Sequence, residues 1–191
     1  MIAALLAVAA VPAAAQYSDA YNFLKAVRER DGNKVTEIAS NPSSTAINSR
    51  DRSTGEGALH ILARGRDYVW LNFLLASGAR VDLQDNQGNT ALMVAAQIGW
   101  TDGAELLLNR GAGVNHSNNR GETPLILAVQ RRDIAMVRLL LGRGGDPNRT
   151  DSAAGYSALD YARQDSRAAP IARALEEAAA KPARPVQGPK L

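Results

Sequence analysis

The sequence has no cysteine and only two histidines, His60 and His116, among its 191 residues. The absence of thiols excludes a disulfide framework, thiolate zinc sites, cysteine-ligated iron–sulfur clusters and a catalytic cysteine. The chain also lacks the motifs G-x-S-x-G, H-E-x-x-H, G-x-x-x-x-G-K-[ST] and a strand-linked G-x-G-x-x-G. These absences predict a protein that is not an enzyme and that holds no metal or cofactor.

Aromatic residues are scarce as well, at 5%, although 46% of the residues are hydrophobic. Most of the apolar content is therefore alanine and aliphatic side chains, which suit close contact between helices better than a sandwich of strands. The composition disfavours an all-β fold. The length allows one ordinary domain with a hydrophobic core and disfavours two.

The sequence has only a small excess of charge of one sign. It contains 22 Lys and Arg residues and 19 Asp and Glu residues, for a formal net charge of +3. The basic residues are scattered along the chain rather than gathered in an arm. No ladder of aromatic residues accompanies them. Nucleic acid is therefore not expected as a partner.

Long hydrophobic runs are missing except at the start, where residues 1–15 (MIAALLAVAAVPAAA) carry no charged side chain. Fifteen residues are too few to cross a bilayer comfortably as a helix. Pro12 follows the apolar core, and Ala13 and Ala15 occupy the two positions that a signal peptidase reads. We therefore expect a signal peptide cleaved after Ala15 and an exported protein, either periplasmic or secreted. The alternatives are a start site assigned too late and an uncut anchor. No membrane span is expected from Gln16 onward.

What the sequence does contain is a repeat of 33 residues. Four positions recur at this spacing in the middle of the chain: Gly88/Gly121, Thr90/Thr123, Leu92/Leu125 and Ala95/Ala128. Similar landmarks surround Leu59, one period earlier, and Leu159, one period plus one residue later. A second pattern, Leu-Leu-x-x-Gly, keeps the same spacing at residues 74–78, 107–111 and 140–144. Two independent patterns in one register predict a repeat protein.

Each unit is predicted to consist of two short helices and a connector. Residues 90–97 place apolar side chains three and four positions apart behind a threonine that can cap a helix. Gly99 ends this helix, and a second helix over residues 102–109 ends at Gly111. The polar, turn-rich residues 114–121 predict a loop or hairpin. One such pair has too little apolar surface to fold alone, so the pairs are expected to stack into a solenoid.

These units resemble ankyrin repeats, whose 33-residue unit carries the signature T-P-L-H-x-A at its first helix. One copy here is Thr-Pro-Leu-Ile-Leu-Ala at residues 123–128, and variants occur at 57–62, 90–95 and 157–162. The resemblance extends from about Arg50 to Leu175. It implies an all-α solenoid of about five helix-turn-helix repeats joined by hairpin-like loops.

The chain is divided accordingly into a signal peptide, a capping repeat, further repeats and a tail. The degenerate N-terminal capping repeat is expected at 16–50 and a disordered proline-rich tail at 181–191. The repeats between them are expected at 51–84, 85–117, 118–150 and 151–180, the last of which is a cap. The alanine-rich start and the small size resemble a bacterial periplasmic protein.

In ankyrin repeats the signature histidine ties neighbouring hairpins together, and the resemblance gives His60 this structural role. Met93, Ile126 and Asp160 replace it in the other copies, so we expect apolar packing to take over from most of the polar network between repeats. His116 is expected in a solvated loop. Four connector aspartates are expected to stabilise turns rather than to act in catalysis: Asp82, Asp85, Asp146 and Asp151.

In arrays of this kind the hairpin tips and the exposed side of the first helices line one concave binding surface. In this sequence the surface comprises two tips and two helix ends: Asn86, Gln87 and Asn89; Asn119, Arg120 and Glu122; Gln97 and Ile98; Gln130 and Arg131. Trp100 is expected either to pack on a neighbouring repeat or to form an exposed apolar anchor with Ile98. Arg132 takes the place of the usual glycine between helices, which leaves the geometry of that turn open.

The resemblance implies a non-enzymatic protein–protein interaction module, a scaffold or stabiliser of a partner protein. Arginine is enriched around the third clear copy, at Arg110, Arg120, Arg131, Arg132, Arg138, Arg143 and Arg149. This enrichment favours a partner with an acidic patch. The alternatives are a regulator or protector of one exported enzyme and a binder of an anionic envelope polymer. A monomer is favoured.

Overall fold

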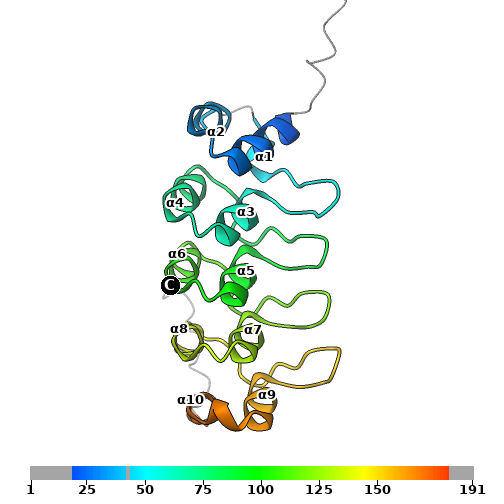
Figure 1. Ribbon diagram of the computed structural model, residues 1–191, viewed down its shortest axis with the longest axis vertical. Helices are drawn as coiled ribbons and strands as arrows, with labels where there is room; N and C mark the ends of the chain where they lie inside the picture. Colours follow the sequence, from blue (N-terminus) through cyan, green and yellow to red (C-terminus); the bar gives the residue numbers. More distant parts are fainter. Residues whose placement is uncertain (1–18, 42–43, 181–191) are drawn as a thin grey trace, which may run out of the picture.

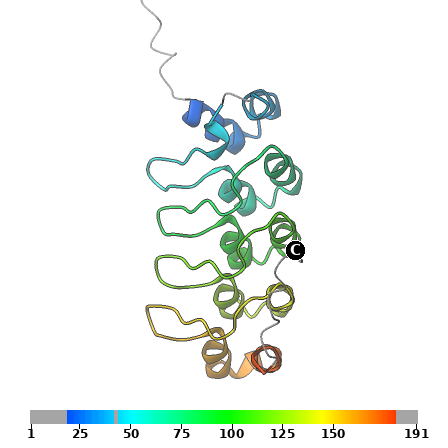
Figure 2. The same cartoon turned by 180° about the vertical axis from the view of Figure 1, so that it is seen from behind.

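The computed structural model describes residues 19–41 and 44–180, which form one elongated stack of helix pairs (Figure 1). The first helices of the pairs form one column, the second helices form another, and the loops project along one side. The view from behind shows the same arrangement (Figure 2). Within the described residues there is no β-strand, and a single β-bridge joins Thr150 and Ser157. The predicted all-α solenoid is confirmed.

Ten helices and two short 3-10 turns make up the described part of the chain. The inner helices, which lie between the loops and the second column, are α1 (Asp19–Glu29), α3 (Ala58–Arg64), α5 (Ala91–Ile98), α7 (Pro124–Gln130) and α9 (Ala158–Gln164). The outer helices are α2 (Gly32–Ala39), α4 (Tyr68–Ala76), α6 (Thr101–Asn109), α8 (Ile134–Gly142) and α10 (Ala169–Ala179). The 3-10 turns are η2 (Ala46–Asn48) and η3 (Ser166–Ala168).

Polar side chains define where most of these helices begin. Thr90 and Thr123 accept hydrogen bonds from the backbone N–H groups of Met93 and Ile126, and so cap α5 and α7. Ser157 does the same for α9. Three aspartates cap outer helices α2, α4 and α8: Asp31, Asp67 and Asp133. Each cap satisfies an N–H group that has no partner within its own helix.

Four of the five turns between the paired helices share a residue in the left-handed conformation, and the turn between α9 and α10 does not. Gly99 has a φ of 67°, and Arg30, Arg66 and Arg132 occupy the corresponding turns with φ of 58°, 50° and 60°. Arg132 therefore keeps the geometry that glycine gives in the neighbouring repeat. The left-handed conformation costs a residue with a side chain about 1 to 2 kcal/mol.

The core is a continuous apolar layer between the two columns of helices. Leu92 of α5 and Leu107 of α6 have no exposed surface. Met93 and Ile126 stand in the register of His60, and they are also fully buried. Apolar packing therefore replaces the histidine in these two repeats, as the sequence predicts.

Polar bonds between repeats are nevertheless abundant, so the expected loss of most of the polar network is wrong. The loops supply it. At their tips, a backbone N–H group of each loop donates to a backbone carbonyl of the preceding loop: Asn86 to Thr54 (3.0 Å), Asn119 to Gln87 (2.9 Å) and Ser152 to Arg120 (2.7 Å). We call this row of bonds the tip ladder.

A second row of bonds, the base ladder, joins the starts of the loops. A side-chain oxygen of each loop accepts the backbone N–H of the next: Asn48 from Arg80 (2.7 Å), Asp82 from Gly113 (3.0 Å) and Asn115 from Asp146 (2.8 Å). The sequence predicts that Asp82 stabilises its own turn, but it bridges two repeats instead. Asp85, Asp146 and Asp151 accept backbone N–H groups of their own loops, as predicted.

The remaining predictions concern the two ends of the chain. The predicted signal peptide (1–15) and the predicted tail (181–191) lie outside the described residues. The pair α1–α2 lies where a degenerate first repeat is expected, and the assigned repeat boundaries stay predictions. Pro170 lies in the first turn of α10. None of the described helices is both long and apolar enough to cross a membrane.

Candidate protein-binding surface

Trp100 is buried, so the exposed apolar anchor, one of the two alternatives for this residue, is wrong. Only 7% of its surface is exposed. The indole ring packs onto Gly103, in the first turn of α6, where an added Cβ would lie 2.1 Å from a ring carbon. The absence of a side chain at Gly103 therefore makes room for the ring. Ile98 is half-buried, and its carbonyl oxygen accepts a hydrogen bond from Arg66 Nη2 (2.7 Å).

Three of the predicted tip residues belong to the framework. Asn86 Nδ2 donates to the carbonyl of Ser53 (2.9 Å), and Asn119 Nδ2 donates to the carbonyl of Asn86 (3.0 Å). Asn89 Nδ2 donates to Asp85 Oδ2 (3.2 Å). These amides hold the loops in shape and in register, so part of their hydrogen-bonding capacity is already used within the stack.

Glu122, predicted as a surface residue, is 8% exposed and lies in a polar cluster. Its Oε2 accepts hydrogen bonds from Asn118 Nδ2 (2.8 Å) and Arg120 Nη2 (2.6 Å). Asn118 Nδ2 also lies 3.0 Å from Asn89 Oδ1, which links two loops. The Arg120 side chain stays 61% exposed, so it is the part of this tip that a partner can reach.

His60 is fully buried and joins its repeat to the next one. Its Nδ1 accepts from the Gly57 N–H (3.2 Å), and its Nε2 lies 2.9 Å from the carbonyl of Asn89. The proton therefore belongs on Nε2, and the predicted structural role is confirmed. His116 is half-exposed and lies 3.3 Å from the Asp82 carboxylate. Across residues 19–41 and 44–180, no group of three or more His, Cys, Asp or Glu residues could hold a metal.

The predicted residues that stay accessible lie mainly at the ends of α5 and α7. Gln97, Gln130 and Arg131 are exposed there, and Gln87 is exposed at a loop tip. Arg131 Nη1 donates to the carbonyl of Gln97 (3.0 Å). The structure thus brings the ends of two neighbouring inner helices together, with a guanidinium lying across them.

Further arginines continue this edge of the stack, and sequence reasoning missed them. Arg64 is the last residue of α3, in register with Gln97 and Gln130, and Arg66 lies after the helix, in register with Gly99 and Arg132. The dipeptide Arg-Asp, which recurs at 30–31, 66–67 and 132–133, is the signal that could have found Arg66. We call the side chains at the ends of α3, α5 and α7 the inner-edge surface: Arg64, Arg66, Gln97, Ile98, Gln130, Arg131 and Arg132.

The arginines of the inner-edge surface differ in their partners. Arg64 pairs with Glu56 and Arg132 pairs with Asp165. Arg131 forms no ion pair with a described residue, because its side chain bonds a backbone carbonyl instead. Its full positive charge is therefore available to an acidic partner.

Asp151 of the last loop and Tyr161 of α9 form a hydrogen-bonded titratable pair. Burial raises the pKa of the Asp151 carboxyl, but hydrogen bonds from the Tyr161 hydroxyl and from the backbone of Ala154 and Gly155 outweigh it, so this pKa lies below its usual value. The same bond to Asp151 raises the pKa of Tyr161 to about 12. At neutral pH the carboxylate stays charged and the phenol stays neutral, which suits a structural lock rather than proton transfer.

The sequence matches the family model for ankyrin repeats three times, over residues 14–118, 59–151 and 102–183. Together the matches span residues 14–183, most of the chain. Repeats of this family indicate a protein–protein interaction module, and the family is generally non-enzymatic. Together with the stacked helix pairs and the threonine caps, these matches show that the chain belongs to the ankyrin-repeat family.

Proposed function

We propose that this protein is a non-enzymatic scaffold or stabiliser that holds one partner protein on its inner-edge surface. The observation that carries the proposal is the contrast between a satisfied framework and a few exposed side chains. The tip amides and His60 already bond neighbouring repeats, whereas Gln97, Gln130 and Arg131 are exposed. Rigid backbone beneath adaptable polar side chains lowers the entropy cost of binding.

The partner is proposed to present an acidic patch, because arginines predominate on this surface. Arg66 and Arg131 make no ion pair within the described chain. If the predicted signal peptide directs export, the partner is an exported or periplasmic protein. The chain is proposed to act as a monomer, with one partner per stack.

Affinity capture after crosslinking in the native compartment tests this proposal. Arg131→Glu is expected to remove the captured partner, because it reverses the one unpaired charge at the α5–α7 junction. Arg110→Glu is the matched control: Arg110 directly follows outer helix α6 and also makes one exposed side-chain hydrogen bond, to Asn72 (2.7 Å). Thermal melts of both variants check that each still folds. Recovery of the same partner at equal yield with Arg131→Glu contradicts the assignment of the surface.

A regulator or protector of one exported enzyme is the second candidate, favoured by the same exposed arginines. It predicts that the captured partner is an enzyme whose activity or lifetime changes with the bound stack. The dependence of binding on salt concentration distinguishes an anionic envelope polymer from a protein partner. Binding to the polymer weakens steeply between about 50 and 200 mM salt. A contact with a folded protein that also uses the half-buried Ile98 depends on salt much less.

A further inference from the structure

The base ladder has an open end at the last loop. Asn48, Asp82 and Asn115 each accept a backbone N–H of the following loop. Asn148 lies in the same register, one repeat after Asn115. Its own N–H donates to Asp146 Oδ1 (2.9 Å), but its side-chain amide has no hydrogen-bond partner in the described part of the chain. α9 and α10 follow this loop and the described residues end at 180, so no described residue completes this rung.

Asn115 shows what such a side chain can bind. Its Oδ1 accepts the N–H of Asp146 (2.8 Å), while its Nδ2 donates to the carbonyl of Gly144 (2.9 Å). One amide thus bonds both polar groups of a neighbouring backbone segment. Asn148 carries the same amide, exposed, and can bind a further segment of extended backbone in the same way.

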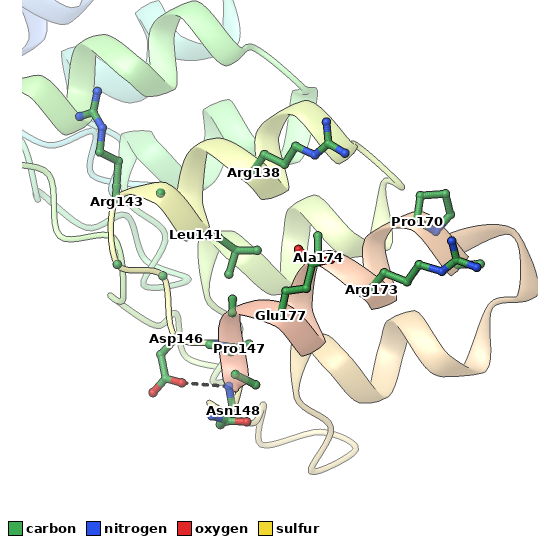
Figure 3. Close-up of a pocket in the computed structure, with 16 residues that line it drawn as sticks. Arg138, Leu141, Arg143, Asp146, Pro147, Asn148, Pro170, Arg173, Ala174 and Glu177 are labelled. Atoms are coloured by element: carbon green, nitrogen blue, oxygen red, sulfur yellow. Dashed lines mark hydrogen bonds between the residues drawn. The ribbon is translucent and has the colours of Figure 1, made fainter. Parts of the chain in front are cut away.

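A groove lies beside Asn148, between α8 and α10. It has a volume of about 1620 Å³, and its lining includes Pro147, Leu141 of α8 and Ala174 of α10. Figure 3 shows arginines coming from both helices around it, Arg138 and Arg143 from the α8 side and Arg173 from α10. The lining of the groove therefore combines apolar side chains, three arginines and an exposed amide that can bind a backbone segment.

Two of these arginines have no counter-charge. Arg143 lies 3.4 Å from Glu105, but neither Arg138 nor Arg173 forms an ion pair with a described residue. Glu177 follows Arg173 by one helical turn and still does not pair with it. The other lining carboxylate, Asp146, is engaged by the N–H of Asn148. Three arginines and two carboxylates line the groove, so its net formal charge is positive.

We propose that this groove binds an extended, acidic segment of a partner protein, with Asn148 on its backbone and Arg138 and Arg173 on its carboxylates. Charge complementarity selects this occupant. The chain's own residues 181–191 carry Lys181, Arg184 and Lys190 and no Asp or Glu, so like charges oppose them. The site lies on the outer helices, apart from the inner-edge surface, and goes beyond the proposed function.

The test measures binding of a fluorescent eight-residue peptide of alternating Glu and Ala to the full chain, by polarisation at low salt. The same peptide with Gln for Glu is the uncharged control. The Glu peptide is expected to bind more tightly. The double variant Arg138→Gln/Arg173→Gln is expected to weaken its binding about tenfold. The pair Arg52→Gln/Arg80→Gln, which removes the same charge from exposed arginines of two earlier loops, should change it less than about twofold.

Asn148→Ala separates backbone recognition from charge. It is expected to weaken both peptides by the same factor, about threefold, without a change in melting temperature, because the side chain has no intramolecular bond to lose. Arg131→Glu should leave peptide affinity unchanged, so failure here and failure of the proposed function are distinguishable. No measurable binding by the unmodified chain, or equal losses in both arginine pairs, overturns the proposal.

Two other occupants have their own signatures, and either one overturns the proposal. If the chain's own terminal segment fills the groove, Lys181→Gln/Arg184→Gln/Lys190→Gln in the full chain changes peptide affinity about tenfold. If a second copy fills it, sedimentation shows a concentration-dependent dimer that Arg138→Gln/Arg173→Gln abolishes. The acidic partner is supported if the chain is a monomer and its affinity for the peptide does not change when the three terminal cations are replaced.

Discussion

The turn between α5 and α6 and the turn between α7 and α8 have the same backbone and opposite chemistry. In the first, Gly99 takes the left-handed position and Trp100 is buried against Gly103, with no side-chain cap on α6. In the second, Arg132 takes the left-handed position, and Asp133 caps α8 through the N–H of Met136 (3.0 Å). One turn is locked by apolar packing and the other by a hydrogen bond and an ion pair.

This difference shows that the repeat determines the path of the backbone, whereas the side-chain interactions that stabilise this path can vary between repeats. Gly103 and Met136 lie in the same register. Where Met136 fills the core with its own side chain, Gly103 leaves space that the Trp100 ring fills from the preceding turn. The pairs Trp100/Gly103 and Asp133/Met136 are thus two ways to fill one volume, and each residue depends on its partner.

The largest effect is expected when Trp100 of the α5–α6 turn is replaced by aspartate, the residue at the corresponding position of the α7–α8 turn. Trp100→Asp removes a buried aromatic ring and is expected to lower the free energy of unfolding by about 3 kcal/mol, since Gly103 leaves the cavity unfilled. The double variant Trp100→Asp/Gly103→Met recreates the chemistry of the α7–α8 turn and is expected to recover most of this loss. Urea unfolding of both variants measures it.

The matching control is Gly103→Met alone, which forces a side chain into the Trp100 ring. Overpacking of this kind costs about 1 to 3 kcal/mol. The two single losses should therefore exceed the loss of the double variant. If they add without coupling, the ring and the glycine are independent and the comparison fails.

An intermediate effect is expected at Gly99. Gly99→Ala places a side chain at a φ of 67° and a Cβ 3.0 Å from Asp133 Oδ2, so a loss of about 1 to 2 kcal/mol is expected. Gly111, with a φ of 88° and open space around it, provides the control. Gly111→Ala should cost only the conformational part, and a larger loss there than at Gly99 would contradict the role of the Asp133 contact.

A smaller effect is expected from the cap of α8. Asp133→Ala removes the hydrogen bond to the Met136 N–H and is expected to cost about 1 kcal/mol. Asp102 lies in the first turn of α6 but caps nothing, so Asp102→Ala should cost only a few tenths of a kcal/mol. Thermal unfolding compares the two; equal losses would mean that the aspartate acts through its charge alone.

The smallest effect at neutral pH is expected from Arg132→Gly. Relief of the left-handed conformation is nearly cancelled by the greater freedom of glycine in the unfolded chain and by the loss of the ion pair with Asp165, so stability should change by no more than about 0.5 kcal/mol. The dependence of stability on pH in the acidic range should change instead. The hydrogen bond from Arg132 is the main cause of the lowered pKa of Asp165.

The sign of that pH effect follows from linkage. A carboxyl whose pKa is lower in the folded state stabilises the fold above its unfolded value, near pH 4, and loses this contribution as the pH falls further. Arg132→Gly should therefore flatten the decline of stability between pH 5 and 3 relative to the unmodified chain. If the decline of stability between pH 5 and 3 is the same in Arg132→Gly, the ion pair between Arg132 and Asp165 does not contribute to it.

Much of the fold follows from the sequence because the repeat expresses it several times. Thr90 and Thr123 each begin a helix, and Gly111 stops one in the left-handed conformation. These features are local, since each depends on residues a few positions apart. A pattern that recurs every 33 residues then also predicts that the helices stack.

The binding surface is harder to predict, because exposure depends on residues one repeat away. Asn86 and Asn119 look free in the sequence, but their amides bond the preceding loops. Glu122 is covered by its own cluster with Arg120. The burial of Trp100 has a local signal, the small Gly103 three residues later, but only the structure shows that the ring fills that space.

The tip ladder links each loop only to its immediate neighbour. Opening one rung therefore leaves all the others closed, and the chain can fray one unit at a time from either end. The same property makes whole units interchangeable in evolution. An inserted or deleted repeat breaks and remakes a single rung, so the length of the stack can change without disturbing the surface that its central repeats present.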